Sequence, residues 1–287
     1  MLGYLISLAA AAAGFLSYMV WESYRYRIDE QTIELQRLPA SFDRTRILFI
    51  SDIHRRSITD DLIARCLSAG RTDLVLIGGD LREKGVPLQR SRENIRKLMK
   101  IAPVYMVYGN HDYDEDIRPL EVMLQEERVR LLHNESVVLE QKDGSRIRLA
   151  GVDDPRTKRD RLERALSEPA DGDELFTLLL AHDPAIVFRM EGASSIDLIL
   201  CGHTHGGQVA LPFIGPVMRH PFEKICWRGW FNLNNPQTAG EWLPRLFVSC
   251  GYGTSKLPIR LLAPAQLHLF TLRSSAALAP NQSKPDR

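Results

Sequence analysis

Two histidines beside three glycines carry the clearest chemistry in this chain. His203 and His205 lie two residues apart in the segment Cys201-Gly202-His203-Thr204-His205-Gly206-Gly207, directly after the largely apolar run 196–200. That run predicts a buried strand, and the glycines predict a tight turn at its end. Such a turn can aim both imidazoles into one space, and neutral imidazole binds Zn, Fe and similar ions. A lone histidine is more often a core or surface residue, but a pair on this turn favours a metal site.

Four further apolar runs end in the same way. They span residues 47–50, 74–77, 104–108 and 176–181, and they lead into Ser51-Asp52-Ile53-His54, Gly78-Gly79-Asp80, Gly109-Asn110-His111-Asp112 and His182-Asp183-Pro184. Helical patterns separate several of them, at Asp60–Ala69, Leu88–Ile101, Pro119–Glu127 and Arg159–Ser167. Alternating strands and helices predict an α/β sheet, in which ligands gather at the carboxyl ends of strands. We therefore expect the five motifs to converge on one site.

A second set of strand-like runs predicts further strands. They are Ile28–Leu38, as an edge strand, Val129–Leu132, Val137–Gln141, Arg146–Gly151, Arg245–Ser249 and Gln266–Leu272. No composition shift divides this region, so we expect one catalytic domain over residues 25–273, after an N-terminal anchor at 1–24. Residues 274–287 are small, polar and proline-containing, which predicts a disordered tail.

The candidate metal ligands are two carboxylates, one amide and four imidazoles. They are Asp52, His54, Asp80, Asn110, His182, His203 and His205. Seven ligands are too many for one four-coordinate ion and suit two ions that share a ligand. Mixed nitrogen and oxygen ligands without thiolate favour Mn, Fe or Zn in an open catalytic site. Two divalent ions about 3.5–4 Å apart can hold a bridging hydroxide as nucleophile and clamp a phosphoryl group.

The five motifs, in this order, resemble those of the calcineurin-like metallophosphoesterases, over about residues 46–272. The resemblance implies a fold of two mixed β-sheets sandwiched between helices, a four-layer sandwich. It also implies that Asp52, His54 and His205 bind a first ion. Asp80 then bridges the two ions.

By the same resemblance, Asn110, His182 and His203 bind the second ion. His111 is no ligand in that family, but lies beside the phosphate and supports the leaving oxygen as general acid or charge partner. Glu83, three residues after the bridging aspartate, is a candidate carboxylate to orient His111. The alternative for Glu83 is a solvated loop residue.

We interpret the chain as a phosphoester hydrolase with two metal ions. The segments Gly251–Ser255 and Pro258-Ile259-Arg260, together with the anchor, look like the membrane-associated bacterial branch of the family, although Pro264-Ala265 stands where typical members carry Pro-Glu. The bond cleaved is expected to be a phosphodiester or a pyrophosphate, with a lipid-linked substrate as one candidate. The alternative from another class is a catalytically silent metal-binding or membrane scaffold protein, against which the complete ligand set and His111 argue.

The N-terminal stretch predicts a membrane anchor. Residues 1–21 contain no charged side chain and approach the roughly 20 residues that span a bilayer, with Tyr18 and Trp21 near one end. Arg25, Arg27 and Arg37 follow, so the positive-inside rule places the catalytic domain in the cytoplasm of a single-pass protein. A signal peptide cleaved near the alanines at 9–13, or a buried or interfacial helix, remains the alternative.

The composition and net charge limit the classes of partner that we expect. The formal net charge of the 287 residues is +1, so no nucleic-acid binding is expected. The four cysteines form no CxxC pair, which indicates reduced, mostly buried thiols. Pro212–Trp242 is rich in aromatic residues and irregular, and is either a lipid-touching loop near the site or a second hydrophobic cluster. The basic run Arg156–Arg161 predicts a solvated face.

Overall fold

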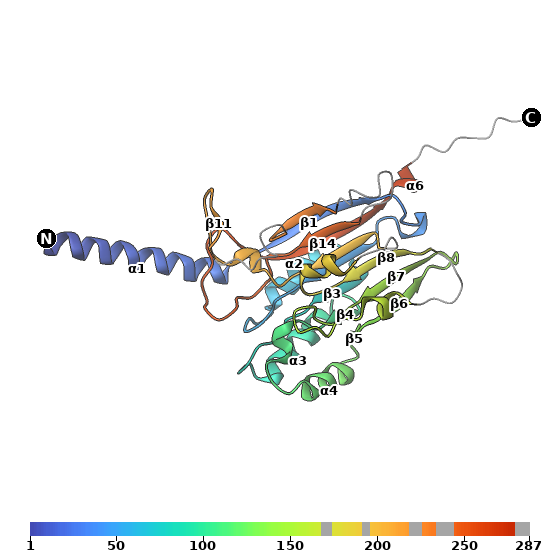
Figure 1. Ribbon diagram of the computed structural model, residues 1–287, viewed down its shortest axis with the longest axis horizontal. Coiled ribbons are helices and arrows are strands. Elements are labelled where there is room, and N and C mark those ends of the chain that lie inside the picture. Colours follow the sequence, from blue (N-terminus) through green and yellow to red (C-terminus); the bar gives the residue numbers. More distant parts are fainter. Residues whose placement is uncertain (168–173, 191–195, 218–225, 234–243, 279–287) are drawn as a thin grey trace, which may run out of the picture.

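The computed structural model describes residues 1–167, 174–190, 196–217, 226–233 and 244–278 (Figure 1). These residues form a long N-terminal helix, α1 (Leu2–Tyr24), and an α/β body built on two six-stranded sheets. Figure 1 shows α1 projecting from one end of the body.

The first sheet is mixed and has the strand order β1-β14-β2-β3-β4-β5. Only the β14–β2 pairing in it is antiparallel. Its strands are β1 (Tyr26–Leu35), β14 (Ala265–Ser274), β2 (Arg46–Ile50), β3 (Leu74–Gly78), β4 (Val104–Val107) and β5 (Arg130–Leu131). The prediction of an edge strand near the start of the domain is confirmed, because β1 lies at the border of this sheet.

The second sheet is also mixed and has the order β12-β13-β9-β8-β7-β6. Its strands are β12 (Gly229–Asn232), β13 (Arg245–Val248), β9 (Leu198–Cys201), β8 (Phe176–Leu180), β7 (Arg146–Gly151) and β6 (Glu135–Glu140). The segment 212–242, which we expected to be irregular, supplies β12 and part of a short hairpin of β10 (Ala210–Leu211) and β11 (Gly215–Pro216). Residues 218–225 and 234–243 of that segment lie outside the described residues.

The two sheets pack face to face between helices, so the predicted α/β sandwich is confirmed. Within β2, Ile47 and Phe49 face the second sheet, whereas Leu48 and Ile50 face the helices on the outer side. The helices on that side are α2 (Asp60–Ser68), α3 (Leu88–Leu98) and α4 (Arg118–Glu126). Helix α5 (Leu162–Leu166) and the 3-10 helix η3 (Pro184–Arg189) cover the second sheet. Strands buried on both faces explain why each motif follows an uninterrupted apolar run.

The C-terminal tail begins later than expected. Ser274 is the last residue of β14, and its buried hydroxyl donates to the carbonyl of Leu38 (2.6 Å). Residues 275–278 form the short helix α6, so the expected disorder does not hold for 274–278. The rest of the predicted tail, 279–287, lies outside the described residues.

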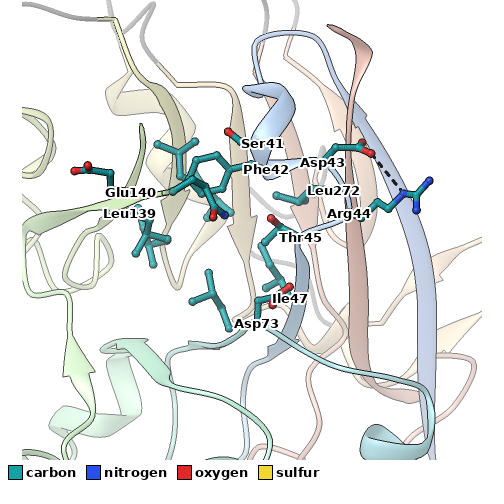
Figure 2. A pocket seen from close by; sticks show the side chains of 15 residues that line it. Ser41, Phe42, Asp43, Arg44, Thr45, Ile47, Asp73, Leu139, Glu140 and Leu272 are labelled. Atoms are coloured by element: carbon teal, nitrogen blue, oxygen red, sulfur yellow. Dashed lines mark ion pairs between the residues drawn. The ribbon is translucent and has the colours of Figure 1, made fainter. Parts of the chain in front are cut away.

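A cavity of about 320 Å³ opens between the sheets at the amino ends of β2, β3 and β8, the edge opposite the five motifs (Figure 2). The two aspartates that line it are already paired. Asp43 contacts Arg44 (3.7 Å) and Arg273 (2.9 Å), and Asp73 accepts the backbone N–H of Arg46 (2.9 Å). Because none of its lining residues belongs to the five motifs, this cavity is not the candidate site.

Candidate metal centre

The carboxyl ends of β2, β3, β4, β8 and β9 bring the five motifs together at one edge of the two sheets. Two groups of candidate ligand atoms result, and within each group the atoms lie within 4.8 Å of one another. One group is Asp52, His54 and His205, and the other is Asp80, His182 and His203. The first group is the set that the sequence resemblance assigns to the first ion, and the second group joins the bridging candidate Asp80 to His182 and His203, two of the three residues assigned to the second ion.

The donor atoms within each group face one another. His54 Nε2 lies 3.0 Å from His205 Nε2, and His205 Nε2 lies 3.5 Å from Asp52 Oδ1. In the second group, His203 Nδ1 lies 3.2 Å from His182 Nε2. Nitrogen lone pairs converging at these distances suit a cation between them better than they suit each other.

Asp80 lies between the two groups. Its Oδ2 is 3.2 Å from His182 Nε2 and 3.5 Å from His54 Nε2, so one oxygen reaches both. The other oxygen, Oδ1, accepts the backbone N–H of His111 (2.8 Å), which fixes the direction of Oδ2. A carboxylate oxygen that reaches nitrogens of both groups is suited to bind two neighbouring ions at once.

The backbone at the ligands is strained. Asp52, His54, Asp80, His203 and His205 all have φ between 50° and 70°, a left-handed region that costs a non-glycine residue about 1–2 kcal/mol. Each of these residues lies two or four positions after the carboxyl end of a strand, where the chain turns. Such strain is typical of functional sites, where packing holds a conformation that the chain alone would avoid.

A glycine allows the close approach of two of these turns. A Cβ on Gly202 would lie 2.5 Å from Asp52 Oδ2, which is closer than such atoms come. The backbone N–H of the next residue, His203, donates to both Asp52 oxygens (3.0 and 3.2 Å). Any larger residue at 202 would therefore displace a candidate ligand.

Burial and neighbouring charges shift the pKa values of the residues in this centre. Burial lowers the pKa of His203 and of His205 well below the usual value, which keeps the neutral form that binds metal. Burial alone would also lower the pKa of His182, but the Asp80 carboxylate outweighs it and raises the pKa well above the usual value. Conversely, burial favours protonation of Asp80, yet His182 and His54 hold its pKa well below the usual range. Asp80 is therefore a carboxylate anion at neutral pH.

Two imidazoles are oriented by partners on their outer nitrogens. His182 Nδ1 lies 2.8 Å from the carbonyl oxygen of Gly78, and donation to it leaves Nε2 free for the centre. His54 Nδ1 lies 3.1 Å from Glu83 Oε2, and Glu83 also pairs with Arg55. A carboxylate behind a ligating histidine raises its basicity and fixes its tautomer.

Glu83 thus has a different partner from the one we expected. The carboxylate beside His111 is that of Asp114, whose Oδ2 lies 2.8 Å from His111 Nδ1. His111 lies in the 3-10 helix η2 (Asn110–Tyr113) and Asp114 caps its C-terminal end, so the two residues, three positions apart, lie above one another. The His111 ring stands 5.2 Å from the His54 ring and is partly exposed, so its remaining nitrogen is accessible at the rim of the centre.

The partners of two further residues near the centre became visible only in the structure. The Arg156 guanidinium contacts His203 Nε2, although we expected a solvated role for the whole run 156–161. Asp112 is buried and accepts three backbone N–H groups, those of Asp80, Gly109 and Arg82, so it shapes the turn.

Other basic and imidazole side chains serve structure. Arg56 does not face the centre, but donates to the carbonyl of Tyr252 (2.8 Å) and to the end of α1. His268 is buried beside Ser249 (3.1 Å), and His133 pairs with Asp153 (3.0 Å). His220 lies outside the described residues. All four cysteines are buried and unbridged, as expected.

Comparison with known proteins agrees with this geometry. Residues 45–207 match the model of the calcineurin-like phosphoesterase family, which is more than half of the chain. The chain belongs to the calcineurin-like phosphoesterase family. It is therefore a metal-dependent phosphoester hydrolase, and its matched region contains all seven predicted ligands, His111 and Glu83.

Relatives of this calcineurin-like phosphoesterase occur in bacteria and animals. It is 35% identical to the protein YpbG of Bacillus subtilis (strain 168), over 92% of this chain and 95% of that one. It is 31% identical to a "Transmembrane protein with metallophosphoesterase domain" of Bos taurus, over 85% of this chain and 56% of that one. It is 30% identical to "Phosphodiesterase YaeI" of Escherichia coli (strain K12), over 59% and 64%.

Solved structures support the fold of this phosphoesterase. The NAD nucleotidase NadN of Haemophilus influenzae matches with a TM-score of 0.50 and 16% identity, over 73% of this chain. A 5'-nucleotidase precursor of Thermus thermophilus matches with the same score and identity, over 80%. The chain spans about half the length of these two proteins, 45% and 54%.

Proposed function

We propose that the protein hydrolyses phosphodiester or pyrophosphate bonds with two metal ions, at a membrane surface. The observation that carries this proposal is the position of Asp80 Oδ2, within 3.5 Å of a nitrogen from each ligand group. The relative named a phosphodiesterase and the relative named a transmembrane protein support the bond type and the location.

The donor set fits a pair of Mn, Fe or Zn ions. Asp52, His54 and His205 would hold the first ion, and Asp80 would bridge to the second. Asn110 Oδ1 is buried and has no hydrogen-bond partner among the described residues, as expected for an oxygen whose partner is a cation. When bound, the two ions supply Lewis acidity and a hydroxide nucleophile near neutral pH.

His182 and His203 would complete the second site with Asn110. In the second group Arg156 lies against the outer side of His203, where its guanidinium adds positive charge beside a substrate phosphate.

His111 is the group that we assign to the leaving oxygen. Asp114 accepts from Nδ1, which stabilises the imidazolium and leaves Nε2–H as the proton donor. Transfer of that proton to the departing alkoxide regenerates the neutral imidazole. Glu83, by contrast, acts as a positioning residue through His54.

The test uses the full chain in lipid nanodiscs, stripped with a chelator and reloaded with Mn. We expect Mn to restore hydrolysis of bis-p-nitrophenyl phosphate and a smaller rate with p-nitrophenyl phosphate. His111→Ala should lower kcat by about 10²–10⁴-fold, the usual contribution of a general acid, while two Mn remain bound. Glu83→Gln should instead weaken metal affinity by about 10–100-fold and be rescued by excess Mn.

Two results would contradict this proposal. Two Mn per chain with no turnover of either ester would reject the enzyme proposal in favour of a silent metal-binding scaffold. A higher rate with the monoester than with the diester would reject the assigned bond type.

We further propose that residues 1–24 are a membrane anchor and that residues 25–273 lie in the cytoplasm. The helix is long and apolar enough to cross a bilayer, with a mean hydropathy of 1.6 over its most apolar window. Arginines gather only after it, at Arg25, Arg27 and Arg37. A cysteine at exposed Val122 should then resist a membrane-impermeant maleimide in intact cells and react after lysis. Labelling in intact cells would reverse the orientation, and a chain shortened at its N-terminus would indicate a cleaved signal.

A further inference from the structure

The base of α1 is fixed to the catalytic body. Met19 and Ser23 are buried, the Ser23 hydroxyl contacts the carbonyl of Pro258 (2.9 Å), and the backbone N–H of Arg260 donates to the carbonyl of Met19 (3.0 Å). The Arg56 guanidinium donates to the carbonyl of Ser23 in the last turn and to that of Arg25, the residue after the helix (both 3.3 Å). The last six residues of the helix therefore belong to the body and not to a flexible tether.

This docking shortens the part of α1 that can enter lipid. About 17 residues, from Leu2 to Tyr18, lie clear of the docked end, and at about 1.5 Å per residue they measure about 25 Å. The hydrocarbon core of a bilayer is about 30 Å thick. For α1 to span it, the surface of the body around the helix has to sink into the interfacial layer, or the bilayer has to thin.

That surface carries exposed apolar side chains. Leu211, Phe213, Ile214 and Val217 lie on the β10–β11 hairpin, and Phe213 at its tip is fully exposed. The loop before β14 adds Leu257 and Leu262, also exposed. Figure 1 shows the hairpin and this loop extending to opposite sides of the end of α1. Soluble surfaces seldom gather apolar side chains in this way without a partner.

The hairpin, the loop and the helix form one hydrogen-bonded unit. The backbone N–H of Ala210 donates to the carbonyl of Leu261 (2.8 Å), and that of Leu261 donates to the carbonyl of Gln208 (3.0 Å). Arg260, next to Leu261, holds Met19 of α1. The apolar tips are therefore fixed at the level where the helix leaves the body.

The residues at the ends of the hairpin and of the loop suit the interface between lipid and water. Phe213, Lys256 and Leu262 have φ between 53° and 64°, so left-handed turns hold these side chains outward. Lys256 is exposed beside Leu257, where an ammonium would meet anionic head groups. Trp21, exposed on the same end of α1, is a residue that favours this layer.

We propose that the β10–β11 hairpin and the loop 254–262 insert into the lipid interface as a second membrane contact. The hairpin begins at Ala210, five residues after His205. Pro216 of the hairpin packs against Gly207, which lies between His205 and Ala210 in the chain. Insertion therefore sets the height of the metal centre above the bilayer and brings it to head-group level. This contact does not depend on the proposed reaction.

The test is depth-resolved fluorescence of the full chain in vesicles of phosphatidylethanolamine and phosphatidylglycerol. Because the four native cysteines are buried, a cysteine introduced at Phe213 or at Leu257 can be labelled selectively with an NBD dye. A cysteine at Val122 on α4, similarly exposed but on another face, is the matched control. Metal content confirms that each labelled variant is folded.

We expect labels at 213 and 257 to emit at shorter wavelength and to be quenched by lipids brominated on the acyl chains. The label at 122 should emit as in water and remain unquenched. Emission at 213 and 257 equal to that at 122 would overturn the proposal. A shift to shorter wavelength without quenching by brominated lipid would also overturn it, because a second protein copy and not lipid would then cover the tips.

Discussion

Asp80→Asn is expected to remove diester hydrolysis almost completely. The substitution replaces the anionic oxygen that reaches both His54 and His182 with a neutral amide, so the ligand that we propose to be shared by the two ions is lost. Metal ions contribute several kcal/mol of transition-state stabilisation, and losing about 4 kcal/mol of it lowers the rate by about 10³-fold. The rate with bis-p-nitrophenyl phosphate and the number of bound Mn, measured together, check this expectation.

Asp197→Asn is the matched control for this experiment. Asp197 is also a buried carboxylate, but it precedes β9 at the opposite edge of the sheet, where it accepts the backbone N–H of Thr177 (2.7 Å). Burial raises its pKa to about 6, and its ion-pair partner is Arg37 (3.5 Å), which belongs to neither ligand group. Asp197→Asn should keep the wild-type rate. If Asp80→Asn retained more than a tenth of the rate with two Mn bound, Asp80 would not bridge the ions, and the proposed centre would be wrong.

The sheets could be predicted because burial on both faces leaves an uninterrupted apolar run. The runs at 47–50 and 176–181 became β2 and β8, and the polar residue after each run marked the sheet edge. Motif order then predicted that the five motifs converge on one site, because the carboxyl ends of neighbouring parallel strands meet at one edge. The division into two ligand sets came from the family resemblance and not from the topology, and the structure groups Asp52/His54/His205 and Asp80/His182/His203.

Partner choice within the site could not be predicted in the same way. Glu83 and Asp114 both lie three residues from a site residue, Asp80 and His111 respectively, so spacing alone does not decide which carboxylate contacts His111. The 3-10 turn of η2 decides it, by stacking Asp114 on His111. A His-x-x-Asp spacing directly after the Gly-Asn turn was the available signal.

Long-range contacts and backbone strain could not be predicted from the pattern of apolar and polar residues either. Arg156 reaches His203 from 47 residues away, and no periodicity encodes that contact. Left-handed backbone at Asp52 and His205 opposes local preference, so it is imposed by packing around the turns. Ser274 is a small polar residue of the kind found in disordered tails. It is nevertheless the last residue of β14, and its hydroxyl makes a buried hydrogen bond.

The second large effect is expected from Arg260→Ala. The Arg260 side chain is completely buried, and its guanidinium donates to carbonyls of the turns that carry the first metal group. The acceptors include the carbonyls of Ala263 (2.7 Å), Cys250 (2.8 Å) and Gly253, and the carbonyl of His205 lies 3.4 Å away. Burial lowers its pKa to about 10, so it remains a cation at neutral pH.

Removing this guanidinium leaves several buried carbonyls without a donor. Each unsatisfied buried group costs about 1–3 kcal/mol, so three of them cost on the order of 5 kcal/mol. For a domain of this size a loss of 1 kcal/mol lowers Tm by about 2–4 °C, so we expect a fall of roughly 10–20 °C. Because the same guanidinium supports the His205 turn, Mn should raise the Tm of Arg260→Ala less than it raises that of the wild type.

Two further variants separate this role from a general loss of charge. Arg260→Lys keeps the cation on a long stem but presents fewer donors, and should fall between Arg260→Ala and the wild type in Tm and in the response to Mn. Arg228→Ala removes an exposed arginine that donates to one carbonyl, that of Leu262 (2.6 Å), and should change stability by less than about 1 kcal/mol. A Tm of Arg260→Ala within about 3 °C of the wild type would show that the buried carbonyls find other donors, and Arg260 would then not be the residue that fixes the His205 turn.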